Sequence, residues 1–204
     1  MGRPKNDLAK KSSRELLLEA ATGLIRTNGY ASTTVDGLCE SAGVSKGTFF
    51  HNFGSKEELA IAAADRWSEM TSEFFRAAPY HQHKDPLERV LGYIRFRREI
   101  LHGDLPDFTC LVGTLVQEVY SSHPAIAQAC HRSIFQHAQT LEHDLAAAKK
   151  LHAPRATWTP KSLALHTQAV IQGAFILAKA SGDAKVAAES IDYLENYIRL
   201  LFKK

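Results

Sequence analysis

Cysteine is scarce in this chain, and its three copies stand far apart. Cys39, Cys110 and Cys130 are the only cysteines among 204 residues, and no two of them have a CxxC spacing. A disulfide scaffold needs an even, closely placed set, and a structural zinc site needs paired cysteines. The spacing argues against both, and three free thiols suit a reducing compartment.

Long apolar runs and catalytic signatures are also missing. No run approaches the roughly 20 apolar residues of a membrane span, and MGRPKNDLAKK has no apolar stretch typical of a signal peptide. We therefore expect a cytoplasmic protein that does not enter a membrane. There is no HExxH, no serine nucleophile elbow and no glycine-rich phosphate loop. His81 and His83 lack a third ligand nearby. We expect no metal, no cofactor and no enzymatic activity.

Charge is modest in total but unevenly distributed. The net charge is +3, and residues 1–56 hold eight Lys and Arg against five Asp and Glu, so the whole excess lies there. Residues 57–204 are neutral. Five basic residues fall between Arg3 and Arg14. Residues 1–11 are either a solvated tail or a flexible basic arm that contacts phosphates.

The stretch from Thr33 to Lys56 predicts two short helices with a tight corner between them. Thr33 is the expected N-cap of the first helix, with Asp36 completing a capping box. Gly43 suits the left-handed residue that ends this helix. Ser45 then caps a second helix over Lys46–Phe53. This order is the helix-turn-helix pattern.

The second helix has the composition of a surface that meets DNA. Phe49 and Phe53 are four apart and face inward, which leaves lysine, small and polar groups on the outside. Lysine and a helix N-terminus attract phosphate, and threonine, histidine or asparagine can reach base edges. Gly47 weakens the helix by roughly 1 kcal/mol relative to alanine. Folding gives no reason for it, whereas close approach of the backbone to a large partner does.

The segment GVSKGTFFHNFGSKEEL resembles the recognition-helix signature of the TetR family of transcriptional repressors. The resemblance runs from Ser12 to Leu59, and the rest fits more loosely in length and layout. It implies a dimer that reads a palindromic operator in double-stranded DNA. One departure is Phe50, where the family usually has tyrosine, so one phosphate hydrogen bond is lost. The candidate DNA-binding residues are Thr33, Thr34, Ser45, Lys46, Gly47, Thr48, Phe50, His51, Asn52 and Lys56.

Helical periodicity continues through the remainder, and no segment has the alternation of a strand. We expect an all-α chain of about nine helices. Residues 1–11 form the arm, 12–56 the DNA-binding domain, and 57–204 the ligand-binding and dimerisation domain. Besides the two helices of the corner, the expected helices are about 13–28, 56–76, 86–101, 108–119, 124–151, 160–181 and 184–202.

The last two helices are too apolar for a simple surface hairpin. Alanine, glycine and leucine cover most of 160–181, and a helix apolar nearly all round must be buried. One possibility is burial inside the monomer. The alternative, which a dimeric DNA reader favours and the family resemblance implies, is a four-helix bundle of two helices from each subunit.

The middle helices hold the candidate effector pocket. Aromatic and polar residues there can line an apolar cavity for a small molecule, or each aromatic can be ordinary core. The candidates are Phe74, Phe96, Phe108, Cys110, Phe135, His166, Gln172 and Phe175, with His137 and Trp158 as further possibilities.

Cys110 needs separate consideration. The segment FTCLVGTLVQE resembles one that occurs in a TetR subgroup whose members include sensors of oxidants or electrophiles. Cys110 lies near an expected helix N-terminus, which lowers a thiol pKa. No Lys or Arg follows within that helix, so a small buried residue is the competing interpretation.

Three functions compete for this sequence. The first is a ligand-responsive repressor, which a small molecule releases from DNA. An enzyme lacks its catalytic constellation, and a non-specific architectural DNA binder would carry more positive charge and would not need a neutral body of about 150 residues. The sequence therefore favours the repressor, without naming its effector, operator or genes.

Overall fold

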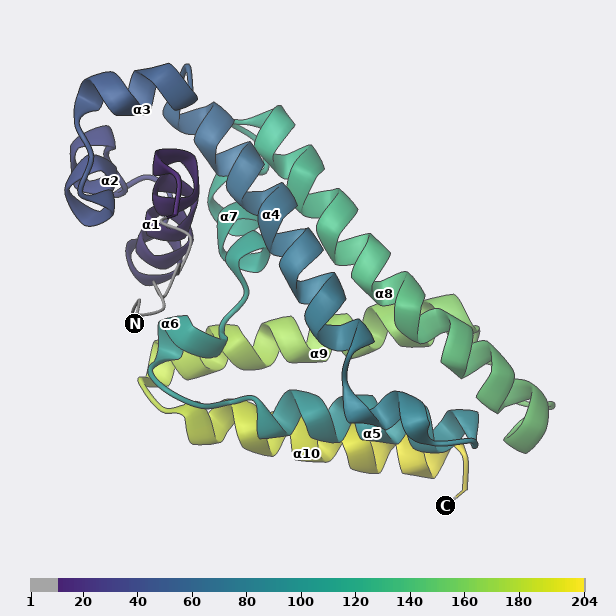
Figure 1. Cartoon of the computed structure of the whole chain (residues 1–204). Helices are drawn as coiled ribbons and strands as arrows, with labels where there is room; N and C mark the ends of the chain where they lie inside the picture. The colour runs from purple at the N-terminus through teal and green to yellow at the C-terminus, as the bar shows by residue number, and fades with distance from the viewer. Residues whose placement is uncertain (1–10, 204) are drawn as a thin grey trace, which may run out of the picture.

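The computed structural model describes residues 11–203, and all regular structure within that range is helical (Figure 1). The all-α prediction is confirmed. The elements are α1 Ser13–Asn28, α2 Val35–Ala42, α3 Lys46–Asn52, α4 Lys56–Arg76, the 3₁₀ turn η1 Pro79–Gln82, α5 Pro86–Glu99, α6 Leu105–Phe108, α7 Leu111–Val119, α8 Pro124–His152, α9 Pro160–Ser181 and α10 Ala184–Leu201.

Local capping fixes most of these boundaries. Ser12 and Glu15 form a complete capping box at the start of α1. Asp85 caps α5, whose first residue is Pro86, and Pro160 opens α9 in the same way. The expected ends of these helices agree with the structure to within two residues.

The expected single helix over 108–119 is wrong. A separate short helix, α6, comes first, with Pro106 in its first turn and Asp104 and Asp107 forming a capping box. Thr109 and Cys110 are extended, and α7 starts only at Leu111. The described residues therefore hold ten α-helices instead of nine.

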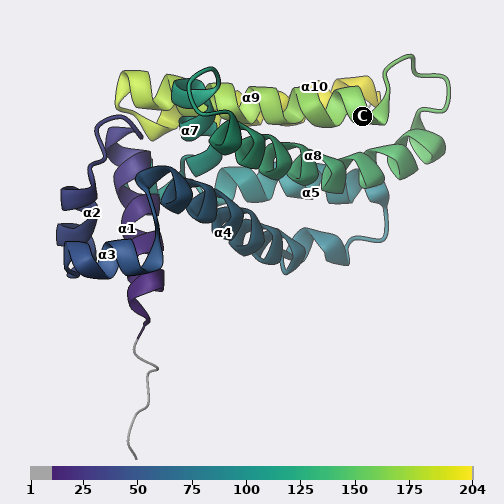
Figure 2. The same ribbon diagram turned by 90° about the horizontal axis from the view of Figure 1, so that it is seen from above.

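The helices form a small head and a larger body (Figures 1 and 2). The head is α1–α3. The helix α4 leads away from it alongside α8, and α5, α9 and α10 pack below them. One apolar core joins the head to α4, α7 and the first half of α8, and a second fills the body. Cys110 packs against both cores, at the junction of head and body.

The predicted basic arm lies outside the described residues except for Lys11, whose ammonium forms an ion pair with Glu19 at 2.7 Å. Cys39, Cys110 and Cys130 are free thiols. None of the helices between residues 11 and 203 has the length and apolar character for a membrane crossing. The same range contains no cluster of three or more His, Cys, Asp or Glu suited to a metal ion.

Candidate nucleic-acid interface and interior cavity

The corner between α2 and α3 is fixed by two hydroxyl caps and one glycine. The Thr34 hydroxyl accepts from the Gly37 amide at 3.1 Å, and the Ser45 hydroxyl accepts from the Thr48 amide at 3.1 Å. Gly43 is left-handed, with φ +63°, and its amide donates to Cys39 and Glu40 carbonyls. The chain therefore turns sharply and presents α3 as a rigid element.

Thr33 does not have the predicted role. It is only 3% exposed, and its hydroxyl donates to the Gly29 carbonyl at 2.7 Å. The cap is one residue later, so Asp36 is not the third residue of a capping box. The Asp36 carboxylate instead pairs with the Lys46 ammonium at 2.7 Å across the corner. This contact raises the pKa of Lys46 through the hydrogen bond and charge of Asp36.

The outer face of α3 is exposed as the sequence predicts. Phe49 and Phe53 are buried, while Lys46, Gly47, Phe50 and His51 face outward, with Phe50 57% exposed. At the two helix caps, Thr34 and Ser45 are exposed too. These six residues are the exposed part of the predicted DNA-binding set, and we call them the α3 patch.

Four predicted residues, Ser45, Thr48, Asn52 and Lys56, have contacts within the chain. The Thr48 and Ser45 hydroxyls lie 2.9 Å apart, and the Asn52 amide nitrogen donates to the Thr48 carbonyl at 2.8 Å. The Lys56 ammonium donates to the Tyr30 carbonyl at 3.1 Å and lies 4.2 Å from the centre of the Tyr30 ring. Lys56 thus holds the start of α4 against the head.

Gly47 has no packing role that its geometry shows. A Cβ built there meets only the Ser45 hydroxyl, at an ordinary 3.6 Å. Its backbone is helical, so an alanine fits without strain. The space that glycine leaves open lies on the outside of the molecule.

A single carboxylate links the head to the body. Glu118 of α7 accepts from the Tyr30 and Ala31 amides, both at 3.0 Å. Gly29, at φ +82°, permits this approach, because a Cβ there would overlap the Glu118 carboxylate. The turn between α1 and α2 is therefore held by a helix about 90 residues away in sequence.

A second set of contacts joins α1 to the body beside Cys110. The Arg26 guanidinium donates to the Thr109 carbonyl at 2.8 Å and stacks 4.8 Å from the Trp67 ring centre. Lys179 of α9 donates to the Arg26 carbonyl at 3.2 Å. Burial, and then the charge of Arg26, lower the pKa of Lys179. Cys110 therefore has two cationic neighbours that its own helix does not supply.

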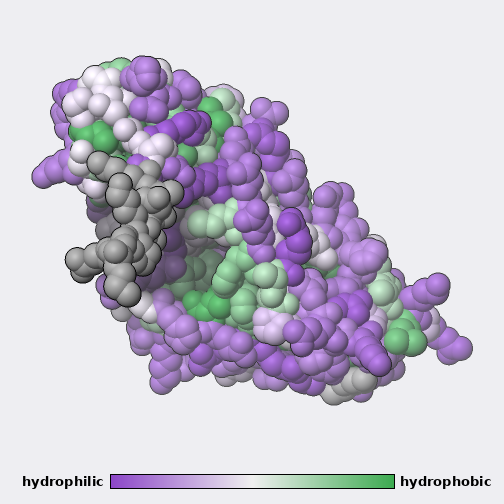
Figure 3. Space-filling model, viewed as in Figure 1, coloured by the Kyte–Doolittle hydropathy of each residue, from purple (hydrophilic) through white to green (hydrophobic). Residues whose placement is uncertain are grey.

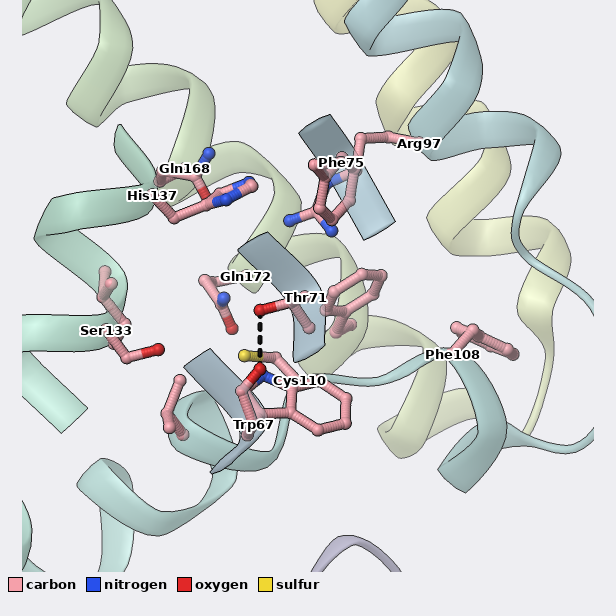
Figure 4. Close-up of a pocket in the computed structure, with 13 residues that line it drawn as sticks. Trp67, Thr71, Phe75, Arg97, Phe108, Cys110, Ser133, His137, Gln168 and Gln172 are labelled. Carbon is pink, nitrogen blue, oxygen red and sulfur yellow. Dashed lines mark hydrogen bonds between the residues drawn. The ribbon is translucent and has the colours of Figure 1, made fainter. Parts of the chain in front are cut away.

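An interior cavity lies next to these contacts between α1 and the body, since Trp67 and Cys110 line it. Its free volume is about 50 Å³, and residues from α4 to α9 line it (Figure 4). Figure 3 shows an apolar hollow between head and body on this side of the molecule. The lining residues are Trp67, Thr71, Phe75, Arg97, Phe108, Cys110, Val112, Ser133, Ile134, His137, Gln168, Gln172 and Phe175.

A second cavity of about 240 Å³ adjoins the first, because Phe75 and His137 line both. The Tyr93 hydroxyl lies 2.9 Å from His137 Nε2 and accepts from the Gln168 amide at 2.9 Å. Burial, with a smaller effect of the Arg97 charge, lowers the pKa of His137 to about 3. The imidazole is therefore neutral near pH 7, and its Nε2 and the Tyr93 hydroxyl share a hydrogen bond.

The predicted pocket residues divide into two groups. Phe108, Cys110, Gln172 and Phe175 line the cavity, as does His137. The others line neither of these two cavities. Phe74 packs on Phe96, Phe135 stacks on His131, His166 packs on Tyr197 at the surface, and Trp158, in the loop between α8 and α9, packs on Phe202.

Sequence reasoning missed several lining residues on α4, α5, α7, α8 and α9. These residues are part of amphipathic helices, and nothing in their spacing marks a cavity. Arg97 stands in the run YIRFRRE beside Arg95 and Arg98, and the sequence does not distinguish it from them. The missed residues are Trp67, Thr71, Phe75, Arg97, Val112, Ser133, Ile134 and Gln168.

Two family models match the chain. The model for bacterial regulatory proteins of the tetR family matches residues 17–63. The model for the C-terminal domain of LmrA/YxaF-like transcriptional regulators matches residues 86–187. The first match spans the head and the start of α4, and the second spans half of the chain, from α5 into α10.

Curated relatives and solved structures agree with these matches. The HTH-type transcriptional regulator LmrA of Bacillus subtilis is 29% identical over 135 residues, which are 65% of this chain and 71% of LmrA. TtgR of Pseudomonas putida, another HTH-type transcriptional regulator, is 32% identical over 140 residues, 61% of this chain and 63% of TtgR. A crystal structure of regulatory protein TetR from Rhodobacter sphaeroides has a TM-score of 0.80 at 21% identity, covering 90% of this chain and 97% of that one.

Proposed function

Because the chain belongs to the tetR family of bacterial regulatory proteins, we propose that it is a cytoplasmic repressor that binds a palindromic operator as a homodimer and leaves it when a small molecule binds. Residues 12–56 are the DNA-binding domain, and residues 57–204 bind the effector and dimerise. The observation that carries this proposal is the exposed, non-acidic face of α3, held by the caps at Thr34 and Ser45.

The α3 patch supplies both kinds of DNA contact. Lys46 and the free amides at the start of α3 suit phosphates, whereas His51 and the edge of Phe50 can reach bases in the major groove. Thr34 and Ser45 are exposed beside them and suit backbone phosphates. Thr48, Asn52 and Lys56 position the helix through the internal contacts described above.

The dimer forms through the outer faces of α9 and α10. Tyr193, Tyr197 and Leu200 recur at i, i+4 and i+7 along α10, and their exposed fractions are 74%, 42% and 74%. Leu177 of α9 is 54% exposed, and the rings of His166 and Tyr197 join the two helices. Packing this face against its copy yields a four-helix bundle.

Size-exclusion chromatography with light scattering tests this interface. We expect a wild-type dimer and a monomer for Leu177→Asp with Tyr193→Asp. Leu151→Asp alters a residue of α8 that is 63% exposed and should leave the dimer intact. A monomeric wild type, or a dimeric double variant, contradicts the assignment.

The effector acts through the joint between cavity and head. Trp67 and Cys110 line the cavity, while Arg26 of α1 stacks on Trp67 and binds the carbonyl beside Cys110. A free volume of about 50 Å³ is below the roughly 300 Å³ of small-molecule sites. An effector must therefore displace the walls, and it favours a state in which the two heads no longer match successive major grooves, about 34 Å apart.

Gel shifts with the DNA that flanks the gene, at fixed near-physiological salt and with random competitor DNA, test the DNA-binding function. We expect specific binding with a two-fold-symmetric footprint. Lys46→Ala with His51→Ala should lose it while remaining dimeric. Wild-type affinity in this double variant contradicts the assignment of α3, and equal binding to random DNA favours an architectural role.

Cys110 supports a second mode of release. It caps α7, where its sulfur accepts from the Gly113 amide at 3.4 Å, and it lies in the cavity wall near Arg26 and Lys179. A cysteine that lines a cavity at the junction of the two cores can pass a chemical change to the head. Peroxide should then weaken operator binding by the wild type and not by Cys110→Ser. An equal response in both proteins means that the thiol only fills space.

A further inference from the structure

The four arginines of α5 differ in their partners. Arg89 pairs with Asp144 at 2.7 Å, Arg95 with Glu195 at 3.0 Å, and Arg98 with Asp192 at 3.5 Å. Arg97 has no carboxylate within ion-pair distance among residues 11–203. It is also the α5 arginine that lines the cavity.

The guanidinium of Arg97 is held by aromatic rings instead of a counter-charge. It lies 4.7 Å from the Phe75 ring centre and 5.7 Å from that of Tyr93. Its Nε–H is buried and has no hydrogen-bond acceptor within the described part of the chain. An unsatisfied buried donor on a charged group is costly to a folded protein and is rare without a functional cause.

The surroundings of Arg97 do not supply a negative charge. His137, which lines the same cavity and feels the charge of Arg97, is neutral near pH 7. Thr71, Ser133, Gln168 and Gln172 provide the other polar atoms of the lining, and all are uncharged. The cavity therefore has one fixed positive charge and no negative one.

The two ends of the cavity have different chemistry. In Figure 4, Arg97 and His137 lie at one end, and Trp67 and Cys110 lie at the opposite end. Phe108, Ile134 and Phe175 add apolar surface to the lining. A bound molecule is thus met by a cation at one end and by flat apolar surface along its body.

We propose that the effector of this protein is a small organic anion, a carboxylate on a flat apolar body, whose carboxylate pairs with Arg97. This inference rests on the proposed function, since it specifies the molecule that the repressor senses. The guanidinium fork donates two parallel hydrogen bonds to a carboxylate, which satisfies the orphaned Nε–H. The body of the anion extends toward Trp67, and the walls at that end move apart to admit it.

Matched acid and amide pairs test the charge requirement. The probes are benzoate and benzamide, cinnamate and cinnamamide, and indole-3-acetate and indole-3-acetamide, each added at one concentration to the full-length dimer. We expect at least one acid to raise the Tm of the wild type more than its amide does. The Kd of that acid, measured by calorimetry, should weaken by about ten-fold or more in Arg97→Met, as expected for a lost charge-assisted hydrogen bond.

Two controls separate ligand binding from folding. Arg95→Met removes a paired arginine of the same helix and should keep the preference for the acid. Without ligand, Arg97→Met should melt at or above the wild-type Tm, since it removes an unpaired charge, whereas a structural arginine would lower it when lost.

The inference is overturned if no acid stabilises the wild type more than its amide, or if Arg97→Met binds the acid as the wild type does. Gel shifts on the same preparations distinguish a failure of the anion inference from a failure of the proposed repressor function. Specific operator binding without any acid preference refutes the anion and leaves the repressor standing. Absence of operator binding refutes the proposed function itself.

Discussion

Replacing Gly47 by alanine separates what α3 needs for folding from what it needs for DNA. The residue is exposed and helical, and a Cβ there meets only the Ser45 hydroxyl at 3.6 Å. Alanine is more favourable than glycine in a helix interior by up to about 1 kcal/mol. Gly47 is the second residue of α3, so the gain is at or below that value. For a chain of this size, about 1 kcal/mol raises the Tm by about 2–4 °C.

The same methyl group should weaken operator binding. Gly47 is exposed on α3 between Lys46 and Thr48, on the face that we propose meets the DNA. We expect a loss of about 1.4 kcal/mol, which is ten-fold in Kd. Fluorescence anisotropy with a labelled operator at fixed salt measures the affinity, and calorimetry measures the Tm.

Gly23 provides the matched control. It lies exposed within α1, and a Cβ there has no neighbour within 4 Å. Gly23→Ala should raise the Tm and leave the operator Kd unchanged. Wild-type affinity in Gly47→Ala, or a fall in its Tm, would refute the reasoning that this glycine serves DNA contact and not packing.

Three further predictions concern charges. Asp36→Asn removes the carboxylate that pairs with Lys46 at 2.7 Å beside the proposed DNA face, so anisotropy should show tighter operator binding at low salt. Glu40→Gln, on the same helix, should change the operator affinity less. Equal effects of the two substitutions would contradict a specific role of the Asp36–Lys46 pair. Glu118→Ala removes the acceptor of the Tyr30 and Ala31 amides. These two amides should then exchange hydrogen faster, and the free energy of unfolding should fall by about 1 kcal/mol. Unchanged exchange rates would mean that this contact does not hold the head. His137 has a folded pKa of about 3 against about 6.5 unfolded, so below pH 6.5 the unfolded state binds a proton that the folded state does not. Its contribution to stability is therefore complete above about pH 6.5 and is lost as the pH falls toward 3, by at most about 1.4 kcal/mol per unit. Urea unfolding measures the free energy of unfolding at pH 7.5 and at pH 5. The decrease between the two should be smaller for His137→Gln than for the exposed His131→Gln, and equal decreases would contradict the lowered pKa of His137.

The sequence by itself determined the helices and the corner that presents α3. Ser12 with Glu15, Pro86 and Pro160 set helix starts, and Gly43 sets the turn. These signals act through backbone groups three or four residues away. They can therefore be recognised without knowledge of the fold. The exposed face of α3 can be recognised in the same way, because Phe49 and Phe53 mark its buried face.

Prediction of helix boundaries from the local sequence failed where two neighbouring residues had the same chemistry. Thr33 and Thr34 are equally good caps, and the structure uses Thr34, because Thr33 is buried against Gly29. It failed again at the start of the helix expected over 108–119, where Thr109 and Cys110 are extended and separate α6 from α7. The choice in each case depends on what packs above the segment.

Only the tertiary structure decided the cavity and the joint with the head. Phe108 and Phe135 are both aromatic residues of the body, but only Phe108 lines the cavity. Arg97 differs from Arg95 in its neighbours, and the chain places Glu118 on the Tyr30 amide 88 residues away. Helix rotation and crossing determine where such side chains point, and these follow from the packing of all the helices together.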